Sequence, residues 1–426
     1  MTQRHPRKRK RRLKPWVPYA LAGIVAVIVG IIVFAIIHTA SEKRGADNGS
    51  AVQSETTEET TTEGEPTIIS SITVGSTGDI LIHPSVLWAF ETEDGHDFTP
   101  AFEYVAPYYK ALDLMVVNLE VPLVDPDDGY EYSSNPFASP DAVAEALKWA
   151  GADICLTANN HTYDMGGYGL IRTQNVLDRV GLEYTGTRKE SDDSFILIKD
   201  VNDIRLGMIC YTYETGGGSY YSKSLNYNPL DDDDAPLVNT FDYDDLDTFY
   251  EDAERQIREM SSQNCDVKIF YMHWGEEYQD QPNDIQTEIA RKLCELGVDV
   301  IIGGHPHVIQ RFDRLESTDG HKTLCLYSMG NELSNQRREF MNEDDYRGYT
   351  EDGLIFILKI DKYSNGEIDI SNVSAIPTWV QRDDSFEIIP LDPKLDPQDW
   401  PADDIDLAKE SFERTMERVW DLFEKN

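Results

Sequence analysis

The chain has 426 residues, 40% of them hydrophobic, which is enough for one large domain or two ordinary ones with a substantial core. Its formal net charge of −40 is uneven, because the first 15 residues hold eight of the 38 Lys and Arg and no acid, leaving 30 basic against 78 acidic residues in the remainder. A body this acidic repels phosphate backbones, which excludes nucleic acid as a partner, and an anionic substrate would need a local positive centre such as a metal ion.

A basic tail over residues 1–15 precedes an uncharged apolar run, Trp16–Ile37. As a helix this run would be about 33 Å long, enough to cross a hydrocarbon core of about 30 Å. By the positive-inside rule the tail stays in the cytoplasm and the chain beyond His38 is outside. A cleaved signal peptide is the alternative, but its apolar region is usually only about 7–15 residues long. We therefore expect a single-pass protein of the cytoplasmic membrane, anchored by residues 16–38, with its carboxyl-terminal domain extracytoplasmic.

Residues 39–66 are rich in Ser, Thr, Glu and Gly and contain almost nothing apolar. Such a segment cannot bury enough surface to offset the entropy lost on ordering. We interpret it as a disordered acidic linker that holds the following domain away from the membrane.

Strands and helices alternate over residues 67–395, which we assign to one domain. The first half is predicted to hold strands at 68–74, 114–117 and 153–157, a helix at 140–150 capped by Ser139 and closed by Gly151, and a hairpin of 195–199 and 205–211 that turns at 202–203. The second half is predicted to hold helices at 243–260 and 284–296, and strands at 267–271, 298–302, 324–327 and 354–360. Residues 396–426 are an acidic extension with a predicted amphipathic helix at about 404–423.

The predicted strands are continuous apolar runs, which are typical of sheets buried on both faces, so the expected class is α/β. Five of them end in a loop rich in Asp, Glu, Asn or His. Open α/β sheets place their sites at the carboxyl ends of strands. We therefore expect these polar strand ends to meet in one site.

The side chains at the strand ends are oxygen and imidazole donors without any cysteine, namely Asp79, Glu120, Asn160, His161, His273, His305 and His307. This mixture suits Mn, Fe or Zn, often as two ions bridged by a carboxylate. His305 and His307 flank Pro306, and in an extended loop both rings would point to the same side. The sequence therefore predicts a site for divalent metal ions, with two ions expected. For His83, four residues after Asp79, a ligand and an ordinary polar residue are both open.

Six short motifs follow one another along the chain: Gly78-Asp79, Asn118-Leu119-Glu120, Asn159-Asn160-His161, His273-Trp274-Gly275-Glu276-Glu277-Tyr278, Gly304-His305-Pro306-His307-Val308 and Tyr327-Ser328-Met329-Gly330-Asn331. Together they make residues 70–335 resemble the CapA-type capsule and poly-γ-glutamate synthesis proteins, whose domain is similar to calcineurin-like metallophosphoesterases. The resemblance implies a four-layer sandwich of two central sheets flanked by helices. It also implies service to the synthesis or export of an anionic γ-linked glutamate polymer, with the membrane proteins of that machinery as partners.

The resemblance further implies a role for each matching residue. The metal ligands would be Asp79, Glu120 as the bridging carboxylate, Asn160, His273, His305 and His307. His161 matches the histidine that protonates a leaving group. Residues of the same motifs that are expected to contact substrate are Asn118, Asn159, Glu277 and Asn331.

Two positions depart from the pattern of the family. Leu81 stands where the phosphoesterase Asp-x-His motif has its histidine, so a water molecule or His83 would have to complete that metal position. Glu332 follows Asn331 where the family commonly has an aromatic residue, and this departure concerns only a pocket wall.

Two functions are compatible with the sequence. In the first, the domain is a metal-dependent hydrolase or transferase acting on a phosphate ester or on an amide of the polymer, with His161 as proton donor. In the second, it is a non-catalytic binding or scaffold subunit whose metal cluster grips glutamate carboxylates while partner proteins make and export the polymer. The donor set favours metal binding in both cases and does not decide between them.

Overall fold

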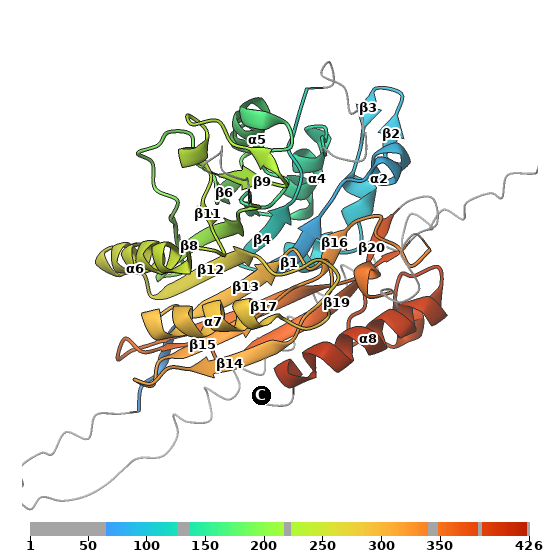
Figure 1. The fold of residues 1–426 in the computed structure, drawn as a ribbon. Coiled ribbons are helices and arrows are strands. Elements are labelled where there is room, and N and C mark those ends of the chain that lie inside the picture. Colours follow the sequence, from blue (N-terminus) through green and yellow to red (C-terminus); the bar gives the residue numbers. More distant parts are fainter. Residues whose placement is uncertain (1–64, 126–136, 217–222, 340–347, 382–385, 424–426) are drawn as a thin grey trace, which may run out of the picture. The chain divides into compact units, whose positions relative to one another are not determined.

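The computed structural model describes residues 65–125, 137–216, 223–339, 348–381 and 386–423 (Figure 1). The predicted basic tail, the anchor of residues 16–38 and the linker up to residue 64 lie outside these ranges, and their assignment stays a prediction. Among the helices that the structure describes, none combines the length and the apolar character needed to cross a membrane. All elements below belong to the compact unit that begins at Glu65.

The first large sheet has the strand order β20-β19-β17-β1-β4-β5-β6. Its strands are β1 (Ile68–Ile80), β4 (Leu114–Leu119), β5 (Ile154–Leu156), β6 (Glu183–Thr185), β17 (Asp352–Tyr363), β19 (Val373–Gln381) and β20 (Glu387–Pro390), with β16 (Asn331–Leu333) beside β1 and β18 (Ile368–Asp369) beside β17. Strands β1, β4, β5 and β6 are parallel, whereas β17, β19 and β20 extend the sheet by antiparallel pairing. The parallel half therefore brings the carboxyl ends of β1, β4 and β5 to one edge.

The second large sheet has the order β11-β8-β12-β13-β15-β14, with β7 beside β8. Its strands are β7 (Leu197–Val201), β8 (Ile204–Tyr213), β11 (Thr240–Phe241), β12 (Val267–His273), β13 (Val300–Gly304), β14 (Phe312–Glu316) and β15 (Lys322–Leu326). Strands β8, β12, β13 and β15 are parallel, so their carboxyl ends also share an edge. Two small hairpins lie outside the sheets, β2 (Glu91–Thr92) with β3 (Gly95–His96) and β9 (Ser224–Leu225) with β10 (Asn228–Pro229).

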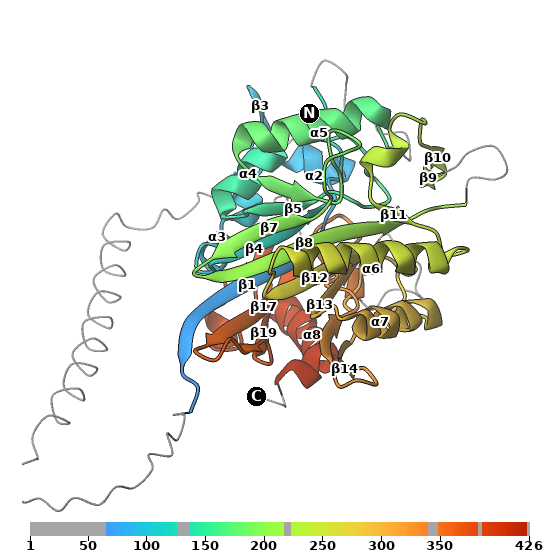
Figure 2. The same ribbon diagram turned by 90° about the vertical axis from the view of Figure 1, so that its left-hand side faces the viewer.

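The two sheets face each other across a shared apolar core, in which Val74 and Val116 of the first pack in one cluster with Met208 and Ile269 of the second. Helices α2 (Pro84–Ala89), α3 (Ala106–Tyr109), α4 (Ala142–Ala150) and α5 (Gly166–Val180) cover the outer face of the first sheet. Helices α6 (Leu246–Ser262) and α7 (Asp284–Leu296) cover the outer face of the second (Figure 2). The structure is a mixed α/β sandwich, which confirms the predicted class.

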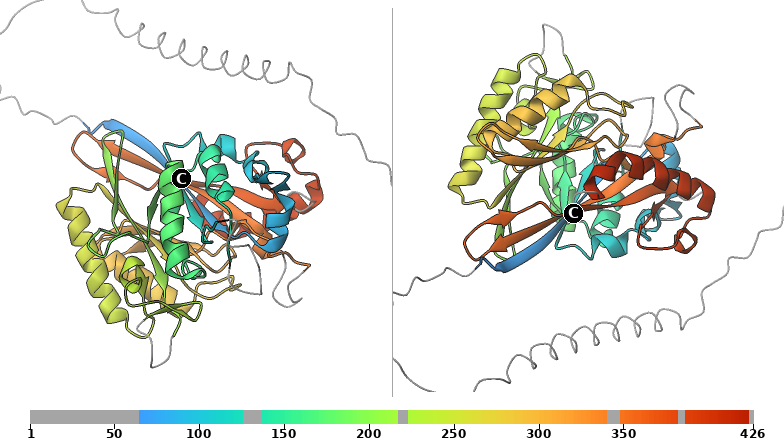
Figure 3. Two further views of the ribbon diagram at one scale, coloured as in Figure 1. Left: turned by 90° about the horizontal axis from the view of Figure 1, so that it is seen from above. Right: turned by 90° about the horizontal axis from the view of Figure 1, so that it is seen from below.

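The last helix, α8 (Ile405–Phe423), confirms the helix predicted at 404–423 and packs on the domain. It runs along β19 and also contacts β14 and β17 (Figure 3). Arg414 of α8 donates hydrogen bonds of 2.9 and 2.7 Å to the two oxygens of the buried Asp352, and Ser411 donates one of 2.7 Å. The ion pair and the hydrogen bonds therefore attach helix α8 to the start of β17, in addition to its packing contacts.

Local sequence signals determine the bounds of one helix and the position of one hairpin turn, as predicted. Helix α7 has the predicted bounds, because Asn283 forms a capping box at its start and Gly297 adopts a left-handed conformation at its end. The β7–β8 hairpin turns at Asn202 and Asp203, whose φ angles of 46° and 63° are those that a tight hairpin turn requires. In both cases the decisive interaction lies within a few residues along the chain.

The start of α4 differs from the prediction. The helix begins at Ala142 with Asp141 at its N-cap, not at Pro140 with Ser139 as the cap. Ser139 is instead held in a bridge with Leu123, in which its main-chain N–H donates to Pro122 and its carbonyl accepts from Val124. A long-range pairing has therefore taken the residue that local sequence favoured as a cap.

Candidate functional site

Asp79 lies inside β1, next to a β-bulge. The register of β1 against β4 shifts between Thr77 and Asp79, so Gly78 is the extra residue of the bulge. No larger residue fits there, because a Cβ on Gly78 would lie 2.0 Å from the carbonyl oxygen of Gly330. The sequence pattern placed Asp79 in the loop after the strand, but β1 continues past it because β4 and β16 both pair with this end of the strand. Its side chain is fully buried.

Asn118 and Glu120 come from the end of β4. The amide of Asn118 donates a 2.7 Å hydrogen bond to Asp79 Oδ1 and lies 3.5 Å from Glu120 Oε2. Glu120 is fully buried, and its Oε1 lies 3.4 Å from His273 Nε2 and 3.9 Å from His307 Nε2. Asn118 therefore spaces the two carboxylates, and Glu120 lies between His273 at the end of β12 and His307 in the loop after β13.

The loop after β13 carries His305 and His307 in left-handed backbone conformations, with φ of 95° and 57°. This corrects the predicted extended loop, and such conformations cost of order 1–3 kcal/mol each in non-glycine residues. The tight loop lets both residues hold one oxygen. The main-chain N–H of His305 donates to Asp79 Oδ2 at 3.1 Å, and His307 Nδ1 lies 3.0 Å from the same atom. Gly304 permits this approach, since a Cβ there would lie 2.7 Å from Asp79 Oδ1.

His273 and Asn160 connect the second sheet to the first. His273 is the last residue of β12, and its Nε2 lies 2.7 Å from Oδ1 of Asn160 in the loop after β5. Both side chains are buried. The convergence that the sequence pattern predicted for the carboxyl ends of the parallel strands is therefore found, and it spans the two sheets.

Among the residues that the structure describes, the donors form three groups, and within each group one ligand atom per residue lies within 4.8 Å of the others. The groups are Asp79–Glu120–His307, Glu120–His273–His305 and Glu277–His305–His307. Glu120 belongs to the first two, as a bridging carboxylate would. Glu120 Oε1 and His305 Nδ1 are buried and have no hydrogen-bond partner, whereas buried polar atoms ordinarily have one. A cation among these donors would satisfy both atoms, so the donor set fits a divalent metal.

Two of the histidines near Glu120, His273 and His305, are in the neutral form that binds metal. Burial lowers the pKa of His273 to about 3, with Asp79 acting against the shift. Burial also lowers the pKa of His305 well below its ordinary value, and the charges of His273 and His307 act in the same direction. Both imidazoles are therefore neutral near pH 7, which is the state that a metal ligand requires.

The two carboxylates differ in their electrostatic environment. Burial raises the pKa of Glu120 well above its usual range, and the charges of Asp79 and Glu277 raise it further. Burial would also raise the pKa of Asp79, but the hydrogen bond and charge of His307 outweigh it and hold this pKa below the usual value. Without metal, Glu120 therefore retains its proton more readily than Asp79, and a cation must displace that proton.

His161 forms a pair with Asp164, which sequence reasoning missed. Nδ1 of His161 lies 2.7 Å from Asp164 Oδ2, and the two side chains are 7% and 1% exposed. The ring of Phe137 stands edge-on to His161 at a centroid distance of 4.5 Å. A proton on Nδ1 is thus directed to the carboxylate, which leaves Nε2 for proton transfer. The signal was present, since Asp164 follows His161 by three residues in a loop that already holds two donors.

A short turn between β9 and β10 closes over this pair. Asn226 and Tyr227 form the turn with φ of 47° and 62°. The Asn226 side chain accepts a 3.1 Å hydrogen bond from Asn160, and its Nδ2 lies 3.2 Å from His161 Nδ1. The ring of Tyr227 is 79% exposed. No pattern in the sequence connects this turn with the site, because only the fold brings it there.

The predicted substrate contacts take different positions. Asn159 is fully engaged by main chain, since its amide donates to the carbonyl of Leu119 and its oxygen accepts from the N–H of His161. Asn331 donates to Gln336 and to the carbonyl of Thr350. Glu277 is exposed beside the two histidines after β13. Contact of these residues and of Asn118 with a substrate stays a prediction.

Tyr213, at the end of β8, is a further residue that the sequence motifs did not indicate. Its hydroxyl lies 3.1 Å from His305 Nε2, and its ring lies 4.8 Å from the His305 ring, centroid to centroid. The Tyr213 hydroxyl engages Nε2 and leaves Nδ1, the buried atom without a partner, as the ligand atom. Tyr213 is therefore placed to orient a ligand rather than to be one.

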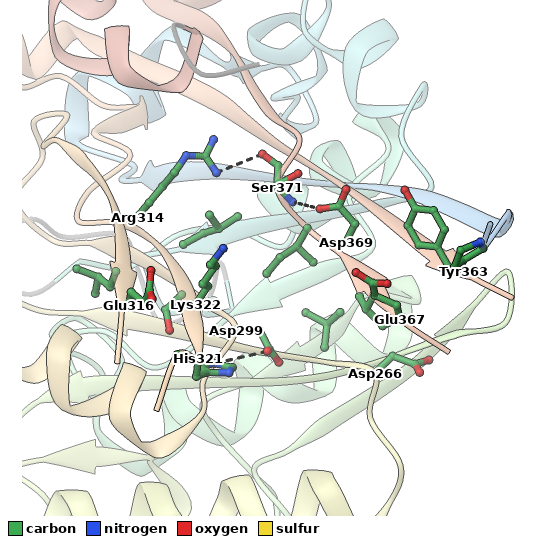
Figure 4. A pocket seen from close by; sticks show the side chains of 18 of the residues that line it. Asp266, Asp299, Arg314, Glu316, His321, Lys322, Tyr363, Glu367, Asp369 and Ser371 are labelled. Atoms are coloured by element: carbon green, nitrogen blue, oxygen red, sulfur yellow. Dashed lines mark hydrogen bonds and ion pairs between the residues drawn. The ribbon is translucent and has the colours of Figure 1, made fainter. Parts of the chain in front are cut away.

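A cavity with a volume of about 980 Å³ lies at the other end of the strands (Figure 4). Asp266, Asp299 and Lys322 line it where β12, β13 and β15 begin. Two of its acidic residues have main-chain partners. Asp266 accepts from the N–H of Arg205, and Asp299 accepts from the N–H of Lys268. Size alone therefore does not indicate the functional site.

Comparison with known proteins places this geometry in a family. The family described as "Bacterial capsule synthesis protein PGA_cap" matches residues 73–336. The capsule biosynthesis protein CapA of Bacillus anthracis is 27% identical over 273 residues, which cover 62% of this chain and 60% of that protein. The PGA biosynthesis protein CapA of Bacillus subtilis strain 168 is 27% identical over 240 residues, covering 55% and 57%. The chain thus spans less than two thirds of either relative.

Among solved structures, TT1561 of Thermus thermophilus aligns with 68% of this chain and 94% of its own, at 9% identity and a TM-score of 0.35, a likeness too low to support an argument. The family match is different in kind, since it covers more than half of the chain and includes all the candidate ligands from Asp79 to His307. The chain belongs to the bacterial capsule synthesis protein family PGA_cap.

Proposed function

We propose that this protein is a membrane-anchored, extracytoplasmic member of the capsule or poly-γ-glutamate synthesis machinery, and that its domain is a metal-dependent hydrolase or transferase with a metallophosphoesterase-like sandwich. One observation carries the proposal. Two groups of possible metal ligands share the buried Glu120, and the His161–Asp164 pair stands next to Asn160 at the same strand ends. Metal ligands beside an oriented histidine are the parts that hydrolysis of an ester or amide requires.

A pair of divalent cations bound there would supply Lewis-acid polarisation of the scissile bond and of the attacking water. The chain's own residues do the rest. His161 transfers a proton from Nε2 to the leaving group, while Asp164 orients the ring through Nδ1. Asn118 holds Asp79 and Glu120 at a fixed spacing, and Tyr213 orients His305.

The charge of the site limits the class of substrate. Histidines and carboxylates dominate the electrostatics of Asp79 and Glu120, and within the described ranges no Lys or Arg forms an ion pair with either. The metal would therefore be the positive centre that receives an anion. A phosphate ester or an amide beside a glutamate carboxylate meets this requirement, in line with the capsule and PGA biosynthesis names of the relatives.

A non-catalytic scaffold is the second candidate, and Leu81 is the observation that favours it. This buried leucine occupies the place of a metal-binding histidine, so one metal position lacks a donor there. A domain that only binds polymer carboxylates would tolerate such a loss more easily than an enzyme would. The partners in that case are the membrane proteins that make and export the polymer.

Three single substitutions in the purified full-length protein separate the two candidates. Turnover of phosphate esters and γ-glutamyl amides is measured together with metal content. His161→Ala is expected to lower the rate by about 10²–10⁴-fold with metal content preserved, because general acid–base groups contribute about that much. His273→Ala should lower both, and His321→Ala, a histidine outside the site, should change neither. Normal turnover of the His161 variant would refute its role, and metal without turnover in the wild type would favour the scaffold.

The location outside the membrane has its own test. The basic residues 1–15 and the uncharged residues 16–37 support an orientation with the domain outside. Protease added to intact spheroplasts should digest the domain or release it from residues 39–66. Complete protection of the domain, with a known external protein digested in the same sample, would contradict the orientation.

A further inference from the structure

The two metal positions of the site are unequally supplied with donors. The position of Glu120, His273 and His305 has a fourth donor, since Asn160 Oδ1 lies 2.7 Å from His273 Nε2. The position of Asp79, Glu120 and His307 has three. Leu81, two residues after Asp79, is 1% exposed and has no donor atom.

His83 does not fill this gap. Its Nδ1 accepts a 3.2 Å hydrogen bond from the main-chain N–H of Asn335, and its ring stands edge-on to Phe137 at 5.2 Å. Among the residues that the structure describes, the groups able to hold a metal do not include His83. This removes one of the two ways in which the sequence could complete the position.

Glu277 is a further carboxylate that approaches His307, one of the three donors of that position. A carboxylate oxygen of Glu277 lies within 4.8 Å of ligand atoms of His305 and His307. Its segment is fixed over their loop, because the N–H of Tyr278 donates a 2.8 Å hydrogen bond to the carbonyl of Pro306. On the other side the N–H of Gly275 donates a 2.7 Å hydrogen bond to the Tyr243 hydroxyl.

The backbone on both sides of Glu277 has left-handed conformations that hold its segment beside the histidine loop. Gly275 and Tyr278 both have positive φ, 88° and 65°, so two left-handed residues enclose the segment. Such a conformation is uncommon for tyrosine, and clusters of such residues occur at ligand sites. Glu277 remains exposed. Its side chain can therefore move onto a cation without breaking any hydrogen bond that the structure gives it.

We propose that Glu277 is the metal ligand that completes the Asp79–Glu120–His307 position in place of the donor that Leu81 lacks. The proposal rests on the metal site of the proposed function and adds a ligand to it. The completed position has three carboxylates and one imidazole, a harder set than the other position. Carboxylate-rich sites suit Mn²⁺ better than Zn²⁺, so the two positions should differ in metal preference.

Metal binding by the full-length protein in detergent tests the proposal without any activity assay. Mn²⁺ is titrated into metal-free protein and followed by electron paramagnetic resonance and calorimetry, for wild type, Glu277→Gln, Glu277→Ala and Glu276→Gln. Loss of outer-shell partners alone weakens metal binding by about 10–100-fold. Loss of a direct ligand should therefore weaken one of the two Mn²⁺ sites by about 100-fold or more and leave the other unchanged. Glu276, the exposed neighbour, is the matched control and should bind as the wild type does.

The outcomes distinguish this inference from the proposed function. Two equally strong Mn²⁺ sites in wild type and in both Glu277 variants would overturn the role of Glu277 and leave the metal centre standing. A single Mn²⁺ site in the wild type would also overturn it, because the position would then be empty with Glu277 present. A wild-type protein that binds no Mn²⁺, Zn²⁺ or Fe²⁺ would overturn both.

Discussion

The two ends of the parallel strands use charged residues in opposite ways. At the amino ends, Asp266 accepts from main-chain N–H and pairs with Lys362 at 2.8 Å, so the charge is matched within the fold. At the carboxyl ends, Asp79 and Glu120 are buried without a Lys or Arg partner in the described structure, and Glu120 Oε1 has no hydrogen-bond partner. The amino end holds the cavity of about 980 Å³, whereas the carboxyl end holds the two buried carboxylates. Buried charges and polar atoms without partners, rather than the volume of a cavity, therefore indicate the functional site.

The largest effect on metal binding is expected when the two imidazoles of the loop after β13 are removed. Replacing His305 and His307 together by Ala removes two ligands and leaves Asp79 and Glu120 as close buried carboxylates, so at least one should gain a proton. Metal content measured by elemental analysis should fall from two ions per chain to near zero. Lys322→Ala, at the opposite end of the strands, is the control and should keep both ions. Equal metal content in the double variant and the wild type would contradict the assignment of His305 and His307 as ligands.

A smaller effect on metal affinity is expected from Tyr213→Phe. This change keeps the ring and removes the hydroxyl that lies 3.1 Å from His305 Nε2. Partners of this kind typically change metal affinity by about 10–100-fold. Calorimetry should show this weakening for the position of His273 and His305 and little change at the other. An unchanged affinity would mean that Tyr213 only packs against the ring.

The smallest effect, and one of a different kind, is expected at the amino end. Asp266→Ala removes a partner of both Arg205 and Lys362 and should lower the free energy of unfolding by about 1–3 kcal/mol, as loss of partly buried hydrogen bonds does. Urea unfolding measures the loss. Metal content should not change. A drop in metal content with stability preserved would contradict the separation of a structural end from a functional end.

The sequence predicted the convergence of the donors because the rule behind it is general. Parallel strands place their carboxyl ends together, and polar residues directly after apolar runs mark those ends. Asp164 could have been found by the same reasoning, since it lies three residues from His161. Tyr213 and Asn226 could not, because their contacts with His305 and His161 depend on the packing of separate elements.

Parts of the fold were also beyond local patterns. Helix α5 begins Gly166-Gly167 and has Gly169 soon after, and glycine opposes helix formation by about 1 kcal/mol per residue, so tertiary packing must hold this start. Strand β19 contains Pro377, which usually demotes an apolar run from strand to loop. The left-handed conformations of His305 and His307 likewise come from the approach of their loop to Asp79, which no short-range signal encodes.

Anomalous diffraction from crystals of the metal-loaded protein would show directly whether the metal centre lies at the carboxyl ends, because it locates each ion at one end of the strands or the other. We expect two peaks at the carboxyl ends, one among Asp79, Glu120 and His307 and one among Glu120, His273 and His305. Data collected on crystals of the His305→Ala/His307→Ala variant should lack both peaks. Peaks confined to the cavity at the amino ends, or no peak beside Glu120 in the metal-loaded wild type, would contradict a metal centre at the carboxyl ends of the strands.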